Sequence, residues 1–144
     1  MRLRAACLAT LVTAAAALAA PMRCTLRTQD GRVAVAFEAM RAGALAGDVR
    51  ITYPSLKTGQ SRTITIARGD VSGYYFVHNR LLIYYSTLVD ERAAILDVDY
   101  DVTASRGTLS LRFSPAALSS RQEMLPDAGQ PDLVDLPLAQ LEVH

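Results

Sequence analysis

Apolar and polar residues alternate along most of the chain, from Arg23 to Phe113, and short groups of turn-forming residues interrupt the alternation. Successive side chains of a β-strand point to opposite faces, so this pattern predicts strands that are apolar on one face and joined by tight turns. We therefore predict an all-β fold, a small antiparallel meander of about eight strands that forms a barrel. A two-layer β-sandwich is the alternative, because alternation alone does not distinguish closure from stacking.

The first predicted hairpin has its turn at Asp30-Gly31, a dipeptide that tolerates the positive φ angles of a tight turn. Pairing about this turn places three pairs on one mostly apolar face: Cys24 with Phe37, Leu26 with Val35, and Thr28 with Val33. Cys24 is therefore expected to point inward. Two further strands are predicted at residues 48–53 and 62–67, and their inward-facing residues are Val49, Ile51, Tyr53, Ile64 and Ile66.

The next predicted hairpin, formed by residues 73–77 and 81–86, is apolar or aromatic on both faces, which favours a position covered on both sides. With a turn at Asn79-Arg80, its four tyrosines pair across the strands, Tyr75 with Tyr84 and Tyr74 with Tyr85. The two pairs then point to opposite sides of the sheet, so at least one is expected to line a groove or a partner surface. We predict these four as ligand-binding residues; the alternative is ordinary cross-strand packing at the edge of the core.

The last predicted hairpin has a loop at residues 104–107, which places Asp99 opposite Arg112 and separates polar from apolar side chains. Its polar face carries Asp97, Asp99 and Asp101, three carboxylates that could help to hold calcium. The common calcium loop has glycine at its sixth position and an acid at its twelfth, where this chain has Val102 and Thr108. We therefore interpret the three as a solvated face that Arg112 partly neutralises, with a metal site as the weaker alternative.

The pattern changes after Phe113. Ser114-Pro115 is typical of a helix start, so a short helix is predicted from Pro115 to about Met124. The Pro-rich segment from about residue 125 excludes a long regular element. The final stretch, residues 138–143, is either a last edge strand or a loose tail.

The N-terminal segment, residues 1–19, has the order of a cleavable secretory signal peptide: two arginines, an apolar run from Ala5 to Ala16, and the small-residue pattern Ala17-Leu18-Ala19. The run is shorter than the roughly 20 residues of a membrane-spanning helix, which makes an uncleaved anchor the second choice. We predict export to the periplasm or the extracellular space, with residues 20–144 as one β domain that does not insert stably into a membrane. Cys24 is then the only thiol, so no intramolecular disulfide forms.

Composition and motifs argue against several classes of function. Without the signal segment, 13 basic residues face 14 acidic ones, and the arginines are spread along the chain, so no nucleic-acid partner is expected. No nucleophile elbow, zinc-protease motif, phosphate-binding loop or Cys-x-x-Cys pair is present. Apart from His144, His78 is the only histidine, and nothing places it beside Cys24 as a catalytic pair. We predict neither enzymatic activity nor a cofactor.

Three hypotheses about function remain. The first is a noncatalytic, exported binding module that contacts a protein, a glycan or a small apolar ligand through the tyrosine hairpin. The second is a structural or interaction subunit of a cell-envelope assembly, which uses the C-terminal segment or pairs a sheet edge with another strand. The third is a calcium-dependent or enzymatic protein that uses the face of Asp97, Asp99 and Asp101.

Overall fold

The computed structural model describes residues 20–86, 94–114 and 126–144 and shows two antiparallel sheets of five strands each. The first sheet has the order β10-β1-β2-β3-β4, with β1 at Met22–Arg27, β2 at Ala34–Ala39, β3 at Val49–Pro54, β4 at Ser61–Ile66 and β10 at Glu142–Val143. The second has the order β5-β6-β7-β8-β9, with β5 at Gly73–Val77, β6 at Arg80–Tyr85, β7 at Leu96–Asp101, β8 at Arg106–Leu111 and β9 at Leu133–Pro137.

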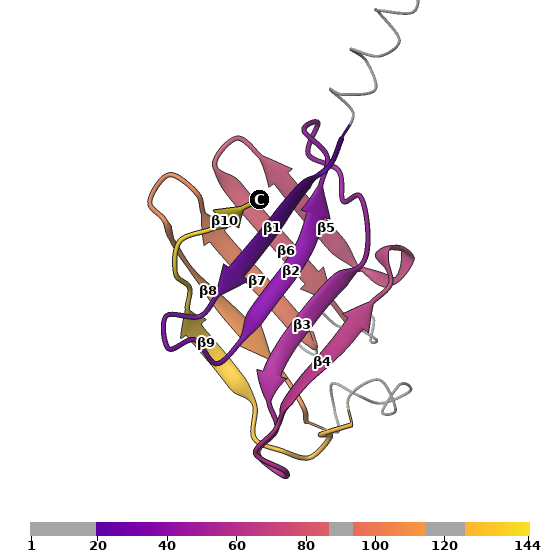
Figure 1. The fold of residues 1–144 in the computed structure, drawn as a ribbon, viewed down its shortest axis with the longest axis vertical. Helices are drawn as coiled ribbons and strands as arrows, with labels where there is room; N and C mark the ends of the chain where they lie inside the picture. Colours follow the sequence, from indigo (N-terminus) through magenta and orange to yellow (C-terminus); the bar gives the residue numbers. More distant parts are fainter. Residues whose placement is uncertain (1–19, 87–93, 115–125) are drawn as a thin grey trace, which may run out of the picture.

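The two sheets form two layers, and their strands cross one another in the view of Figure 1. Because β4 and β5 pair with no further strand on their outer sides within the described residues, the barrel is not closed. The all-β antiparallel prediction is confirmed, and a sandwich describes the arrangement as well as an open barrel does. The only helical element in the described part is the short 3-10 turn η1 at Arg68–Asp70, and the predicted helix from Pro115 lies outside it.

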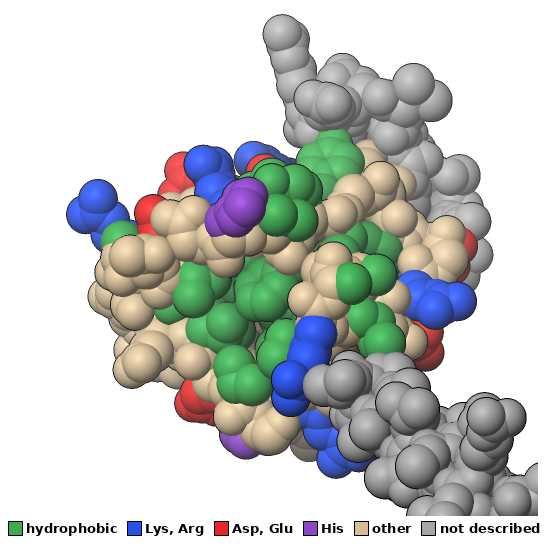
Figure 2. Space-filling model, turned by 90° about the horizontal axis from the view of Figure 1, so that it is seen from above, with side chains coloured by type: hydrophobic (Ala, Val, Ile, Leu, Met, Phe, Trp, Pro, Cys, Tyr) green, Lys and Arg blue, Asp and Glu red, His purple; other side chains and the backbone are tan. Residues whose placement is uncertain are grey.

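The core lies between the two sheets and consists of their inward-facing side chains. Tyr53 and Tyr100, one from each sheet, are among the largest fully buried side chains, and Phe113 packs on the Tyr53 ring with centroids 5.1 Å apart. Figure 2 looks down on the upper end of Figure 1 and shows hydrophobic side chains between the layers, with charged ones around the rim. Alternation in the sequence therefore corresponds to one apolar face on each sheet, as predicted.

The first hairpin has the predicted register. Cys24 pairs with Phe37 and Leu26 with Val35, and the Thr28 amide donates to the Val33 carbonyl at 2.9 Å. The turn has Gly31 at φ 74°, and the Asp30 carboxylate accepts hydrogen bonds from the Thr28 hydroxyl and the Arg32 amide. These bonds, with the Thr28 hydroxyl contributing most, lower the pKa of Asp30 to about 2.

The predicted register of the tyrosine hairpin is wrong by two residues. Val77 pairs with Arg80, so the turn is His78-Asn79, with His78 at φ 57°. Tyr75 therefore lies opposite Leu82 instead of Tyr84. A shift of two residues leaves every side chain on its predicted face, because the period of a strand is two.

The predicted register of the last hairpin is wrong by four residues, since Asp99 lies opposite Thr108 instead of Arg112. Asp101 pairs with Arg106, so the loop is residues 102–105 and Gly107 belongs to β8. Gly107 lies so close to β7 that an added Cβ atom would collide with the Asp99 carbonyl and lie 2.6 Å from the Cα atom of Tyr100. The sequence suggested a turn glycine, whereas the structure uses it for the close approach of two strands.

The C-terminal segment belongs to both sheets. β9 pairs with β8, β10 pairs with β1, and Leu138 between them is fully buried. The backbone amides of Leu138 and Ala139 donate to Gly107 of one sheet and Arg27 of the other, at 2.9 and 2.8 Å. The segment therefore supplies two strands beyond the predicted meander and is not a loose tail.

Candidate functional site

The outer side of the β5–β6 hairpin carries an apolar surface. We call it the β5–β6 face and define it by its four residues, Tyr75, Val77, Leu82 and Tyr84. Tyr75 is 44% exposed and Val77 38%, and both are among the most exposed large hydrophobic side chains of the described chain. Leu82 and Tyr84 are half-buried beside them on β6. This is the aromatic surface on one side of the sheet that the sequence predicts.

The other two predicted tyrosines point into the sandwich. Tyr85 is buried in the core, and Tyr74 packs edge-on against Phe37 of the other sheet, with ring centroids 6.2 Å apart. Burial raises the pKa of Tyr74, and its buried hydroxyl has no hydrogen-bond partner within the described residues. Tyr74 and Tyr85 are thus placed as packing residues, whereas Tyr75 and Tyr84 remain on the candidate surface.

Charged residues border the β5–β6 face. The guanidinium of Arg80 donates two hydrogen bonds to the Asp99 carboxylate, at 3.0 and 2.7 Å. Asp97 lies opposite Tyr84 on β7, and burial, followed by the charge of Asp99, raises its pKa. An apolar centre with a polar rim is the usual composition of a protein interface.

Two of the three aspartates of β7, Asp99 and Asp101, have separate partners. Arg80 pairs with Asp99, while Arg112, the predicted partner, lies 3.9 Å from Asp132. The Asp101 carboxylate accepts a hydrogen bond from the Ala104 amide at 2.8 Å. In the part of the chain that the structure describes, no group of three or more His, Cys, Asp or Glu side chains is placed to hold a metal ion.

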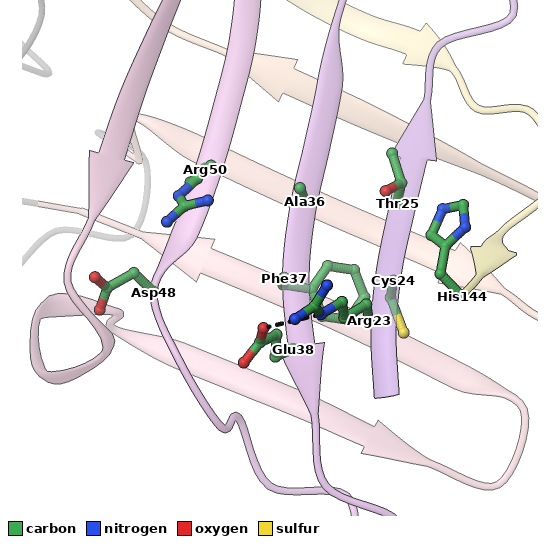
Figure 3. A pocket seen from close by; sticks show the side chains of 9 residues that line it. All are labelled: Arg23, Cys24, Thr25, Ala36, Phe37, Glu38, Asp48, Arg50 and His144. Carbon is green, nitrogen blue, oxygen red and sulfur yellow. Dashed lines mark ion pairs between the residues drawn. The ribbon is translucent and has the colours of Figure 1, made fainter. Parts of the chain in front are cut away.

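A hollow of about 590 Å³ lies on the outer face of the first sheet (Figure 3). Its floor includes two short side chains, Thr25 and Ala36, and longer charged ones surround them, among them Arg23, which lies 3.6 Å from Glu38. Arg50 and His144 complete the rim from β3 and from the residue after β10. This hollow could not be predicted from the sequence, because its residues come from distant segments. The only indication of it in the sequence is that Thr25 and Ala36 are short residues at outward-facing positions.

A buried carboxylate joins the C-terminal segment to the β3–β4 hairpin. Asp127 is 1% exposed and accepts hydrogen bonds from the Tyr53 hydroxyl at 2.9 Å and the Ser55 hydroxyl at 2.6 Å. The Arg62 guanidinium lies 3.2 Å away. Burial alone would raise the pKa of Asp127, but the hydrogen bonds and the positive charge of Arg62 outweigh it and lower the pKa. The role of Asp127 could not be predicted from the sequence, because its partners are more than 60 positions away.

Cys24 and His78 do not form a catalytic pair. Cys24 is 2% exposed inside the sandwich, where burial raises the pKa of its thiol, and His78 lies at the exposed β5–β6 turn. The predicted inward orientation of Cys24 is confirmed, which leaves the thiol as a packing group.

We expect the Cys24 thiol to resist modification in the folded protein. Iodoacetamide should label it more than about a hundredfold more slowly in buffer than in urea, because burial both shields the sulfur and suppresses the thiolate. The rate is measured by mass spectrometry. The double variant Cys24→Ala, Thr103→Cys, with its thiol in an exposed loop, serves as the control and should react quickly in both conditions. Equal rates for native Cys24 would contradict the buried position.

Comparison with known proteins finds no matching family model, no matching curated protein and no matching solved structure. Within the described residues, no helix is long and apolar enough to cross a membrane.

Proposed function

We propose that this chain is a noncatalytic, exported binding module that contacts a protein partner through the β5–β6 face. The observation that carries the proposal is that Tyr75 and Val77, from one strand, are 44% and 38% exposed. Tyrosine supplies a large apolar area and a polar tip at a low cost in side-chain entropy, which is why it is frequent in interfaces. Export is the part of the proposal that rests on the signal-peptide pattern of residues 1–19 alone.

A protein is a better fit to this surface than a small molecule. Small ligands bind in concave sites that cover most of their surface, whereas protein interfaces are flatter. Neither the hollow on the first sheet nor the one of about 520 Å³ beside Arg80 and Asp99 is lined by Tyr75. The β5–β6 face instead has an apolar centre with charged residues, among them Arg80 and Asp99, at its rim, a composition that is common in protein interfaces.

The test compares Tyr75→Ala with Leu56→Ala, which truncates an apolar side chain that is 56% exposed on the β3–β4 loop of the other sheet. Immobilised residues 20–144 capture proteins from a cell-envelope extract, and proteins lost with Tyr75→Ala but retained with Leu56→Ala are purified. Their dissociation constants should rise at least about tenfold with Tyr75→Ala, as expected for a central interface tyrosine. A thermal melt confirms that both variants fold.

Two outcomes would contradict the proposal. One is a set of captured proteins that is the same for both variants. The other is a Tyr75→Ala variant that unfolds, since this residue would then serve the fold and not a surface.

A further inference from the structure

The two sheets have four edge strands, and three of them carry features that prevent pairing with another chain. β10 is only two residues long. β9 contains Pro137 and has Asp135 at φ 52°. Its register with β8 also shifts between Leu109 and Leu111. At β5 the β2–β3 loop covers the backbone, since a Cβ atom added to Gly43 would lie 2.6 Å from the Phe76 carbonyl oxygen. Short strands, proline, irregular backbone and a covering loop are the usual protections of a sheet edge.

The fourth edge, β4, differs from the other three. Its six residues contain no proline and no lysine, and β-branched threonine and isoleucine alternate from Thr63 to Ile66. No strand of the described chain pairs with its outer side. A regular strand of this composition with an open edge is a template for a further strand.

The register with β3 shows which backbone groups of β4 point outward. The Ser55 amide donates to the Gln60 carbonyl, so the hydrogen-bonded pairs of this antiparallel ladder are Tyr53 with Arg62 and Ile51 with Ile64. The backbone N–H and C=O groups of Thr63 and Thr65 therefore point to the open edge. They are the donors and acceptors that an added strand would use.

The one charged side chain of β4 does not protect this edge. An inward-pointing charge can protect a sheet edge from pairing, and Arg62 does face the inner side of the sheet. Its guanidinium, however, lies 3.2 Å from the buried Asp127 carboxylate, and Arg62 is only the second residue of the strand. The outward-facing side chains of the strand are the hydroxyls of Ser61, Thr63 and Thr65. An approaching strand therefore meets no unpaired charge.

We propose that two copies of this chain associate through β4, antiparallel and about a two-fold axis at Ile64, into one continuous sheet. In this register Thr63 of each copy lies opposite Thr65 of the other, and each such pair exchanges two N–H···O bonds. The central side chains of the two copies also match. On the outer side of the sheet threonine lies opposite threonine, and on the inner side the half-buried Ile64 lies opposite Ile64 of the other copy.

A second copy fits this edge because, around Ile64, the two-fold axis brings each outward backbone donor opposite an acceptor of the same strand in the other copy. The antiparallel sense of the first sheet continues without a break, and no like charges face each other. The dimer uses a surface separate from the β5–β6 face and does not depend on the function proposed above.

Analytical ultracentrifugation of residues 20–144, from about 1 μM to about 1 mM, tests the proposal. We expect a concentration-dependent monomer–dimer equilibrium. Thr65→Pro removes an outward N–H without breaking the ladder to β3, and Thr63→Lys places two ammonium groups at the interface; each should raise the dissociation constant at least about tenfold. Thr108→Lys, a matched change at an exposed residue of β8, should leave the constant unchanged. Thermal melts verify folding, and Thr63→Lys retains the test if Thr65→Pro does not fold.

Disulfide cross-linking tests the register. Ile64→Cys places two thiols at a pair that is not hydrogen-bonded, where Cβ atoms are about 4.5–5.5 Å apart, so oxidation should yield a covalent dimer. Residues 20–144 without this substitution, whose only thiol is the buried Cys24, should not be cross-linked. A chain that stays monomeric to about 1 mM, a dimer that survives both edge variants, or an edge that binds only a different extended peptide would overturn the proposal.

Discussion

Asp127→Asn should lower the free energy of unfolding by about 2 to 3 kcal/mol. The substitution removes the charge that the hydroxyls of Tyr53 and Ser55 and the guanidinium of Arg62 all face. Arg62 is 38% exposed at its side chain, so water recovers part of the lost ion pair and the effect falls below that of a fully buried pair. Urea unfolding monitored by circular dichroism gives the value.

The effect should disappear in acid. Because the pKa of Asp127 is lower in the folded chain than in the unfolded one, its stabilisation is complete above the unfolded pKa of about 4 and is lost as the pH falls through the folded pKa. The difference between the parent chain and Asp127→Asn should therefore shrink below about pH 4.

The matched control is the substitution Asp135→Asn. Asp135 is exposed and has a positive φ angle, which asparagine tolerates as well as aspartate does. It should change the stability by less than about 0.5 kcal/mol. Equal effects of the two substitutions, or a difference that does not depend on pH, would show that the buried network does not hold the C-terminal segment.

Gly107→Ala should cost about 3 kcal/mol or more, or prevent folding. The new methyl group would collide with the Asp99 carbonyl, a backbone atom that cannot turn aside as a flexible side chain can. Displacing β8 from β7 would also disturb the Leu138 amide, which donates to the Gly107 carbonyl at 2.9 Å. Thermal and urea unfolding measure the loss.

Gly69→Ala is the control for this prediction. Gly69 lies in the exposed η1 turn, and a Cβ atom added there meets nothing within 4 Å. We expect a change of less than about 1 kcal/mol. If Gly107→Ala were tolerated as well as Gly69→Ala, the loop of the last hairpin would be at residues 104–107, as the sequence suggests.

Local patterns explain why much of the fold could be predicted. Asp30-Gly31 determines its own turn, and the side chains of that hairpin separate cleanly into two faces, so its register was correct. In the β5–β6 and β7–β8 hairpins, registers shifted by two and by four residues give the same separation of faces, so alternation could not choose among them. Tyr75 was therefore placed on the correct face but opposite the wrong residue.

The candidate surface was predicted in part for the same reason. The period of two places Tyr75 and Tyr84 on one side of the sheet and Tyr74 and Tyr85 on the other, whichever register is chosen. It does not tell which side the core covers. The second layer decides this, because Phe37 of the first sheet packs on Tyr74 and leaves Tyr75 exposed.

By itself, the sequence determined the strand class, the first hairpin and the inward position of Cys24, because these depend on residues close together in the chain. Only the tertiary structure decided that Asp127 is buried against β3 and β4, that Gly107 lies against β7, and that β4 is the open edge. The positions of Asp127 and Gly107 depend on contacts between segments distant in the chain, and the open edge depends on the lack of a strand beside β4 in the described part of the chain. Periodicity within one strand carries no information about either.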